Sequence, residues 1–451
     1  MNRPAGLLYA ADERPPSVPL LALAVQHIFL MSSTLVLPVI LVAEIGGGPD
    51  QVRAVVAMTM IAAGLGTILQ AVRWWGIGSG FLCPNLAGPN FFSVCVSAAW
   101  FGGLPMMRGM TIAAGLVELV LARALPRLAF LFPPPITGLV VFMVAISLVP
   151  VGASRFFGVN FEGEQIQGLN LGVAAATLLT MAGVSVWGSA RLRLYGLLIG
   201  LTVGYLLSIA TGELTQSQYK VLADVPWIGL PSYDGFWNIS FSWSLLPAFV
   251  IVSICGALKS FGNLVMCERV NNDNWTKPDI RRVGGGLTAD AITVTVSGLL
   301  GGMATDTSAS NVGLSKATGA TSRWIGGAAG LLFIALGFSP KLAATLSIMP
   351  DPVAGAVLIF VVSFMFISGC QMMLSEKLDN RMTFVLGISL LVGLSADIAP
   401  AIYAHIPGVL RPLLGSSLTL ATVSAIVLHR VFSLGARQTR AAPVRAESLA
   451  D

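Results

Sequence analysis

Long apolar runs without charged side chains recur along the whole chain. Each is long enough to cross a hydrocarbon core of about 30 Å, which takes about 20 residues of helix. No stretch between the runs is long enough for a separate soluble domain. About twelve spanning helices are predicted, at residues 18–43, 51–72, 104–124, 136–153, 169–188, 192–211, 243–268, 282–303, 323–345, 352–373, 382–397 and 409–430.

Two further segments, about 81–99 and 308–321, begin as polar stretches rich in small residues and turn apolar or small only afterwards. Neither suits an ordinary spanning helix. Non-helical backbone at membrane depth survives only where protein covers it or it lines a cavity, because an unsatisfied amide in lipid costs several kcal/mol. We therefore predict two broken helices, with Pro89 in the first turn of one half-helix and Ser308, Ser310 or Asn311 as the N-cap of the other.

The composition is that of an integral membrane protein. Apolar residues make up 55% of the chain, charged residues 10%, and the mean hydropathy is +0.81, whereas about a quarter of a soluble domain is charged. The five cysteines form no CxxC pair, and the chain has no P-loop, no HExxH and no GxSxG at a strand-to-helix turn. We therefore expect no enzyme, no metal site and no cofactor. The small positive net charge indicates how the protein is oriented in the membrane and does not indicate nucleic-acid binding.

The charges of the loops predict that orientation. Counting both broken segments as crossings gives about fourteen, which places the two termini on one side. If that side is cytoplasmic, about 18 Lys and Arg lie in inner loops and tails and about 6 in outer loops. The first 17 residues lack the apolar core and cleavage site of a signal peptide. Both termini are therefore expected in the cytoplasm and the protein in the cell's inner membrane.

A weak internal repeat links the two halves of the chain. FPPPITGLVVFMVAISL from Phe132 resembles MPDPVAGAVLIFVVSFM from Met349, and a broken segment precedes each copy at a comparable distance. Because seven crossings per half is an odd number, the two copies must lie inverted in the membrane. Interrupted segments at corresponding positions of two halves indicate a substrate site near the midplane.

Polar residues interrupt three of the apolar helices. Gln26 and His27 lie in the middle of the first, where a histidine is either a structural hydrogen-bonding group or a direct ligand. Lys259, Ser260 and Asn263 interrupt the eighth crossing, and Lys259 and Asn263 share one helix face. A buried ammonium needs a counter-charge or an anionic ligand, and the alternative is a lysine that snorkels to the helix end.

Asp290, about two turns into the ninth crossing, is the third interruption. It is expected to form a structural ion pair with Lys259 or Lys316, to couple an ion, or to do both. The sequence does not decide which of the two lysines it meets.

The broken segments complete a candidate substrate site. Half-helices that start near the midplane would direct their positive dipole ends and free amides into one cavity, which favours an anionic or carbonyl-rich ligand. Asn90 lies at one start, and Ser310 and Asn311 lie at the other. Phe91 and Phe261 either supply a stacking face or pack in the apolar core.

These residues resemble the nucleobase-ascorbate transporter family, also called the xanthine/uracil permeases, over nearly the whole chain. The Pro-x-x-Gly helix starts at Pro135 and Pro352 agree with the internal duplication of that family. Its more specific motifs are matched by Gln26-His27, by GxGSG at Gly76–Gly80 and by Asn311-x-Gly313-x-x-x-x-Thr318-Gly319.

The resemblance implies an all-α polytopic fold of about fourteen transmembrane segments in a seven-plus-seven inverted repeat. Crossings three and ten would be broken helices whose short strands cross at the substrate site, and a core domain would move against a gate domain in an elevator-like cycle. Family members are commonly homodimers that take up purines, pyrimidines or ascorbate with protons or sodium. The expected boundaries are 1–17 and 431–451 for the cytoplasmic tails, 18–125 and 243–346 for the core, and 126–242 and 347–430 for the gate.

Three positions depart from the family pattern. Lys259 stands where nucleobase carriers of the family present a glutamate that hydrogen-bonds the base. Asn263 stands at an often acidic position and Ser310 at one that is usually Gln or Glu, whereas Asp290 matches an acidic position of the ninth helix. Because lysine offers only donors, we expect the site to prefer anionic or acceptor-rich ligands over a neutral base such as uracil.

Three functions therefore stay open. The first is a secondary transporter of a small anionic ring compound, such as a urate-like base or an aromatic or organic acid. In it Lys259 would bind the charge, Ser310 and Asn311 would orient the ligand, and Asp290 with His27 would support the site or couple an ion. The second is proton-coupled symport of a neutral nucleobase. The third is an anion exchanger or channel, because sulfate and bicarbonate carriers share the inverted architecture.

Overall fold

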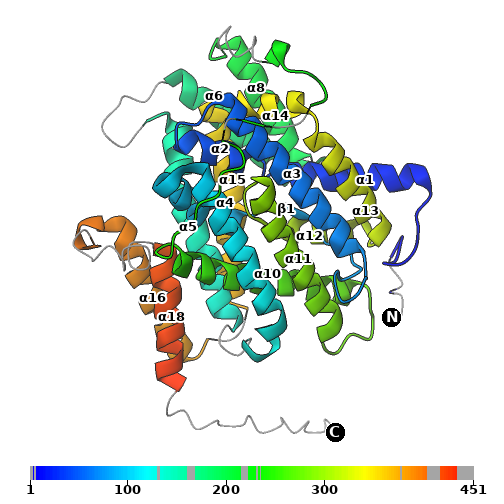
Figure 1. Cartoon of the computed structure of the whole chain (residues 1–451), viewed down its shortest axis with the longest axis vertical. Helices are drawn as coiled ribbons and strands as arrows, with labels where there is room; N and C mark the ends of the chain where they lie inside the picture. The colour runs from blue at the N-terminus through cyan, green and yellow to red at the C-terminus, as the bar shows by residue number, and fades with distance from the viewer. Residues whose placement is uncertain are drawn as a thin grey trace, which may run out of the picture.

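The computed structural model describes residues 4–433 except 5–6, 129–132, 160–167, 194, 215–221, 230–231, 234, 376–377 and 404–416. Helices dominate this part of the chain, and its two short strands lie among them in the interior (Figure 1). The elements are α1 (Ser17–Ser32), α2 (Val36–Glu44), α3 (Pro49–Ala71), β1 (Asn85–Ala87), α4 (Pro89–Leu128), α5 (Pro134–Phe157), α6 (Gly168–Trp187), α7 (Ala190–Arg193), α8 (Gly196–Ala210), α10 (Leu246–Val270), α11 (Ile280–Leu300), β2 (Thr305–Thr307), α12 (Ala309–Thr318), α13 (Arg323–Gly337), α14 (Pro340–Ser347), α15 (Asp351–Met373), α16 (Asn380–Ile398), η2 (Pro400–Tyr403) and α18 (Ser417–Ser433).

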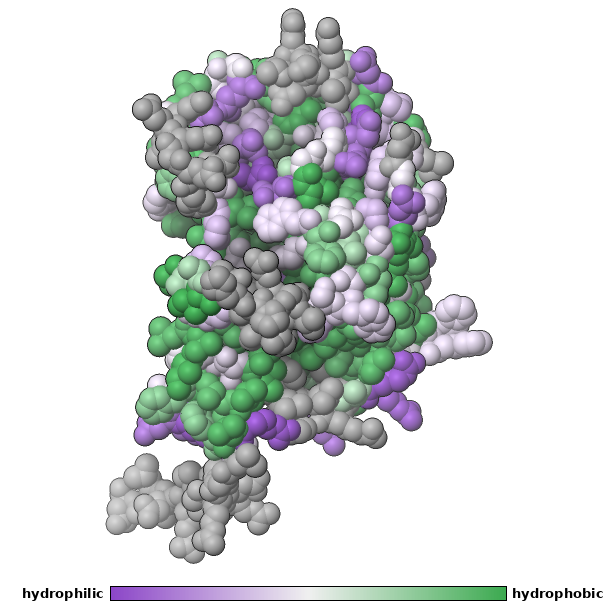
Figure 2. Space-filling view, turned by 60° about the vertical axis from the view of Figure 1, so that its left-hand side comes forward, coloured by the Kyte–Doolittle hydropathy of each residue, from purple (hydrophilic) through white to green (hydrophobic). Residues whose placement is uncertain are grey.

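The described helices are those of an integral membrane protein. Nine of the described helical segments are long and apolar enough to cross a bilayer, or ten if the bent pair α13 and α14 is one span. Two shorter apolar helices, α8 and α18, add to them. Figure 2 shows hydrophobic residues over broad areas of the lower half of one face, with hydrophilic residues at its lower rim and in its upper part.

Two predicted spans are interrupted in the structure, although Ser17–Glu44 still qualifies as one candidate span. The predicted 323–345 helix is bent by 76° between α13 and α14, because Pro340 starts a new helix and the preceding Ser339 takes extended angles. The predicted 18–43 helix is divided into α1 and α2 by a three-residue turn. Residues 409–416 of the last predicted span lie outside the described residues.

The two strands provide hydrogen-bond partners for the non-helical backbone of the broken segments. β1 and β2 pair antiparallel, with Asn85 opposite Thr307 and Ala87 opposite Thr305. Hydroxyls of α3 cover amides at the strand ends: Thr67 accepts from the Asn85 N–H at 3.0 Å, and Thr59 accepts from the Met303 N–H at 2.9 Å. The predicted half-helices follow directly, since α4 begins at Pro89 and Ser308 caps α12 through the Asn311 N–H.

The helices that carry the repeated Pro-x-x-Gly motif pack against each other in opposite directions. Near the start of α5, Gly138 lies against the backbone of Gly369 and Met373, at the end of α15. At the other end, Gly355 of α15 lies against the backbone of Arg155 and Phe156. The two copies of the motif are therefore antiparallel neighbours.

A segment before α1 lies along the turn that follows α12. The Leu8 N–H donates to Gly319 O at 2.8 Å, and the Thr321 N–H donates to Tyr9 O at 2.8 Å. The Arg323 N–H donates to Ala11 O at 2.9 Å, and the Arg323 guanidinium pairs with Asp12 at 3.2 Å. This segment therefore joins the beginning of the chain to the end of its second broken crossing.

Glycines allow α3 and α13 to approach closely, which gives a test of the packing. A Cβ added to Gly64 would lie 2.6 Å from the Gly330 carbonyl oxygen, so Gly64→Ala should lower the free energy of unfolding by about 1–3 kcal/mol. Gly172 of α6 has open space around it, so Gly172→Ala should leave stability unchanged or raise it by about 0.5–1 kcal/mol. Thermal unfolding in detergent would measure both, and equal melting temperatures for the two variants would contradict the packing.

Candidate functional site

The strand pair brings polar side chains from three helices to one place. Asp306 of β2 is 1% exposed and lies at its centre. Lys259 of α10 forms an ion pair with it at 2.6 Å, and Asn90, in the first turn of α4, donates to the same carboxylate oxygen at 2.6 Å. Ser260 lies 3.3 Å from the other oxygen. Asp306 is therefore held by both broken crossings and by α10.

Asp290 of α11 forms the second half of this network. Asn85 of β1 donates to one of its oxygens and Ser260 to the other, each at 2.6 Å. Ser260 also lies 2.7 Å from the hydroxyl of Thr307, which accepts from the Asn263 amide at 2.9 Å. One face of α10 is thereby joined to both strands through hydrogen bonds that are buried from solvent.

His27 of α1 fixes the start of α12 through Asn311. Its Nδ1 lies 2.7 Å from Asn311 Oδ1, and Asn311 Nδ2 donates to Ser308 Oγ at 2.8 Å. Both His27 and Asn311 are buried. In this arrangement the histidine is a structural partner of the half-helix.

The remaining polar groups differ in how far they are exposed. The Lys259 side chain is 18% exposed and uses one of its three donors on Asp306. Ser310 is exposed in the first turn of α12, and Gln26 is half-buried, with an Oε1 that has no partner among the described residues. The accessible part of the network thus offers mainly donors, which suits a ligand rich in acceptors.

Other predicted residues lie away from the network or inside the core. Lys316 is exposed on α12, two turns after Ser308. Phe91 is fully buried, whereas Phe261 of α10 is half-buried. In this conformation only Phe261 of the two rings has surface with which a planar ligand could stack.

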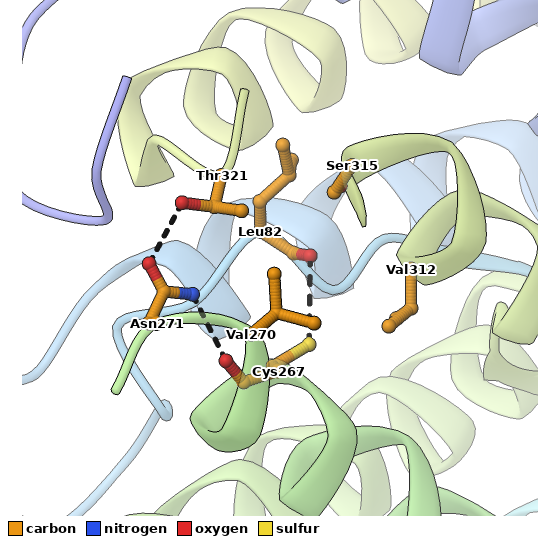
Figure 3. Close-up of a pocket in the computed structure, with 7 residues that line it drawn as sticks. All are labelled: Leu82, Cys267, Val270, Asn271, Val312, Ser315 and Thr321. Carbon is orange, nitrogen blue, oxygen red and sulfur yellow. Dashed lines mark hydrogen bonds between the residues drawn. The ribbon is translucent and has the colours of Figure 1, made fainter. Parts of the chain in front are cut away.

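A cavity in the described part of the chain lies outside this network and is small. Leu82, Cys267, Val270, Asn271, Val312, Ser315 and Thr321 line it (Figure 3). Its volume of about 10 Å³ is close to that of one water molecule. Asn271 bridges Thr321 and the Cys267 carbonyl across it, at 2.7 and 2.9 Å. This cavity is too small for a ring compound and contains none of the predicted site residues.

The expected ion pair of Asp290 with Lys259 or Lys316 is wrong. The ion pair of Lys259 is with Asp306, and Asp290 accepts hydrogen bonds from neutral groups instead. Sequence reasoning missed Asp306 because it lies between the predicted 282–303 helix and the polar run from 308. The Thr-Asp-Thr alternation was the available signal, since it precedes a half-helix as Asn85 does in the first broken segment.

Two further features bear on the chemistry. Among the described residues, no group of three His, Cys, Asp or Glu side chains could hold a metal ion. Glu118 of α4, also missed, is 3% exposed, and neither of its carboxyl oxygens has a hydrogen-bond partner in the described chain.

The Lys259–Asp306 pair gives a second prediction. Replacing either partner alone leaves a buried charge unpaired, so Lys259→Gln and Asp306→Asn should each destabilise the protein by about 3–5 kcal/mol. The double variant removes both charges and should cost less than the sum of the single changes. Lys316→Gln, at an exposed position, is the control and should change little. Unfolding midpoints of the four variants measure this, and additive effects of the two substitutions would contradict a direct pair.

The chain is similar in sequence to known permeases over nearly its whole length. The chain is 27% identical over 443 residues to the xanthine permease XanP of Escherichia coli, with 94% of each chain covered. It is 27% identical over 432 residues to the uric acid permease PucK of Bacillus subtilis, covering 93% of this chain and 97% of that one.

Solved structures show the same fold at low sequence identity. The transmembrane domain of the cyanobacterial bicarbonate transporter BicA is 12% identical with a TM-score of 0.58, covering 93% of this chain and 99% of that one. The murine Slc26a9 anion transporter is 11% identical with a TM-score of 0.60, covering 94% and 69%. The xanthine/uracil permease model, described as "Permease family", matches residues 19–402. The chain belongs to this family of permeases and is a transporter, not an enzyme.

Proposed function

We propose that this protein is a secondary active transporter of a small nucleobase-like ring compound that is rich in acceptors or anionic, such as a urate-like base. The observation that carries the proposal is the partly exposed ammonium of Lys259. It lies close to the strand pair, and the exposed Ser310 lies at the start of α12. Lysine and an amphoteric hydroxyl can satisfy carbonyl oxygens and deprotonated ring nitrogens, whereas a lysine cannot accept from ring N–H groups.

The relatives support a nucleobase as cargo. The names of XanP and PucK assign xanthine and uric acid to those proteins, and both are oxopurines with several carbonyl acceptors. The two anion transporters share the fold at 11–12% identity, which carries no argument about cargo. The likeness to these two anion transporters therefore does not support an anion exchanger or channel as the function of this protein.

One observation favours a second candidate, the symport of a neutral nucleobase. Asp306 already neutralises Lys259 at 2.6 Å, so the ammonium does not require an anionic ligand. In that case the substrate would meet a neutral ion pair, and its acceptors would use the remaining Lys259 donors without any gain from net charge.

The transport cycle that we propose is of the elevator type. Both broken crossings and α10 meet at the strand pair, and the residues around it belong to the proposed core, 18–125 and 243–346. The antiparallel packing of α5 on α15 supports an inverted repeat whose gate is 126–242 and 347–430. Fourteen crossings would result if α4 supplies two of them across its Gly102–Gly103 kink and if β2 with α12 supplies one. We also propose cytoplasmic tails at 1–17 and 431–451, an inner-membrane location and a homodimer.

Uptake into proteoliposomes distinguishes the two candidate cargoes. The Lys259→Gln/Asp306→Asn double variant keeps the site neutral but removes the ammonium donors. A hydrogen bond to a charged group contributes about 1.5–3 kcal/mol, so the affinity for urate should fall about tenfold or more. The affinity for uracil should fall less, and Lys316→Gln should leave both unchanged.

Radiolabelled urate, xanthine and uracil would be compared at saturating and subsaturating concentrations. A similar loss for uracil and urate would favour the neutral-nucleobase candidate. Failure of the wild-type protein to take up any of the three would contradict both candidates.

A further inference from the structure

Glu118 is a buried acid without a described partner in the middle of a membrane-spanning helix. Its side chain is 3% exposed, and neither oxygen has a hydrogen-bond partner among the described residues. It points at α10: a Cβ added to Gly256 would lie 2.9 Å from Glu118 Oε1 and 3.3 Å from the Phe91 ring. Gly256 lies one turn before Ser260, and Phe91 follows Asn90, so this carboxyl is directly behind the substrate network.

The charges around Glu118 are mainly negative. Asp290 and Asp306 both interact with it electrostatically and are themselves buried. Asp306 is compensated by Lys259 and Asn90, and Asp290 receives donors from Asn85 and Ser260. Of the three carboxyls, Glu118 alone has no described donor. An ionised carboxylate that is buried in this way is strongly disfavoured unless it binds a cation.

The elements packed against α4 carry few charged groups close to Glu118, since Arg281 and Arg282 lie at the far start of α11. α2 and α5 contribute only Glu44 and Arg155, which pair with each other at 2.9 Å. Next to Gly256, α10 carries the buried Cys255 and, one turn further on, the Lys259 ammonium, whose ion pair is with Asp306. The acids come from α11, as Asp290, and from β2, as Asp306.

A proton is the cation that fits this position. A metal ion needs several oxygen ligands around it, and the described chain gathers no such group of side chains. The groups that converge on Glu118 are the Gly256 backbone and an aromatic ring. A proton needs no ligand other than the carboxyl oxygen to which it binds.

We propose that Glu118 is the proton-binding site that couples transport to the pH gradient, an inference that rests on the proposed symport. When an anionic or acceptor-rich substrate reaches Lys259, it adds negative charge close to Glu118. It also accepts hydrogen bonds from the ammonium, which then compensates the charge of Asp306 less fully. Both effects favour protonation of Glu118, and by linkage a protonated Glu118 favours substrate binding. The proton and the substrate are therefore bound together and released together.

Transport by Glu118→Gln tests the coupling. Glutamine has nearly the same shape as a protonated glutamate and cannot release a proton. With one proton per substrate, a gradient of one pH unit supports at most about tenfold accumulation in the wild type. Glu118→Gln should still exchange substrate at equilibrium, but its accumulation ratio should fall to about one and its pH profile should become flat. Accumulation and a pH profile equal to those of the wild type would overturn the proposal.

Infrared difference spectra between acid and alkaline pH test the proton site without any substrate. The wild type should show the C=O stretch of a buried carboxylic acid that titrates, and Glu118→Gln should lack it. Glu44→Gln is the matched control, because the Glu44 side chain has an ion-pair partner in Arg155 at 2.9 Å and this substitution should leave the signal unchanged. If the signal persists in Glu118→Gln, the proposal is wrong. If instead the wild type transports no nucleobase while the signal depends on Glu118, the proposed cargo fails and the proton site stands.

Discussion

Backbone hydrogen bonding at membrane depth is the constraint on which the rest of this structure depends. A chain that leaves the helical conformation inside a bilayer must find partners for its amides within the protein. Here the two interruptions satisfy each other, Asn85–Ala87 against Thr305–Thr307, and threonines of α3 cover two of the amides at their ends. The polar side chains of the site lie where they do because these strands need one another.

The same constraint explains why so many polar groups are gathered there. Strand residues project side chains to both faces of the pair, and β2 offers Asp306 towards α10 while β1 offers Asn85 towards α11. Once a carboxylate is placed in such a position, it requires donors, and Lys259, Asn90 and Ser260 supply them. Lys259, which departs from the family pattern, therefore has its counter-charge within the protein, at Asp306.

Periodicity and composition were sufficient to predict a largely helical integral membrane protein. This is because the length and hydrophobicity of a spanning helix can be read from its own residues. They predicted the broken segments and the helix start at Pro89, which are confirmed. They also gave three N-cap candidates for the second half-helix, of which Ser308 is the cap. The strands and the family followed from the resemblance, and both are confirmed.

The sequence did not predict which side chains contact each other when they lie far apart along the chain. Lys259 and Asp306 are joined through a strand register, and Glu118 reaches α10 only because Gly256 leaves room for it. The kink before Pro340 was readable in principle, since a proline disfavours helix at the residue before it, but its apolar surroundings hid it.

The segment that precedes α1 has a consequence for how the chain is made. Leu8, Tyr9 and Ala11 exchange backbone hydrogen bonds with Gly319, Thr321 and Arg323, more than three hundred residues later in the sequence. During synthesis the segment before α1 has no backbone partners of this kind until the second broken crossing has been made and inserted. The contact therefore forms late in biogenesis, and closing so long a loop makes it dependent on the assembly of the helices between. A bulky fusion placed at the front of the chain would disturb the completion of α12 and its turn before it disturbed any individual span.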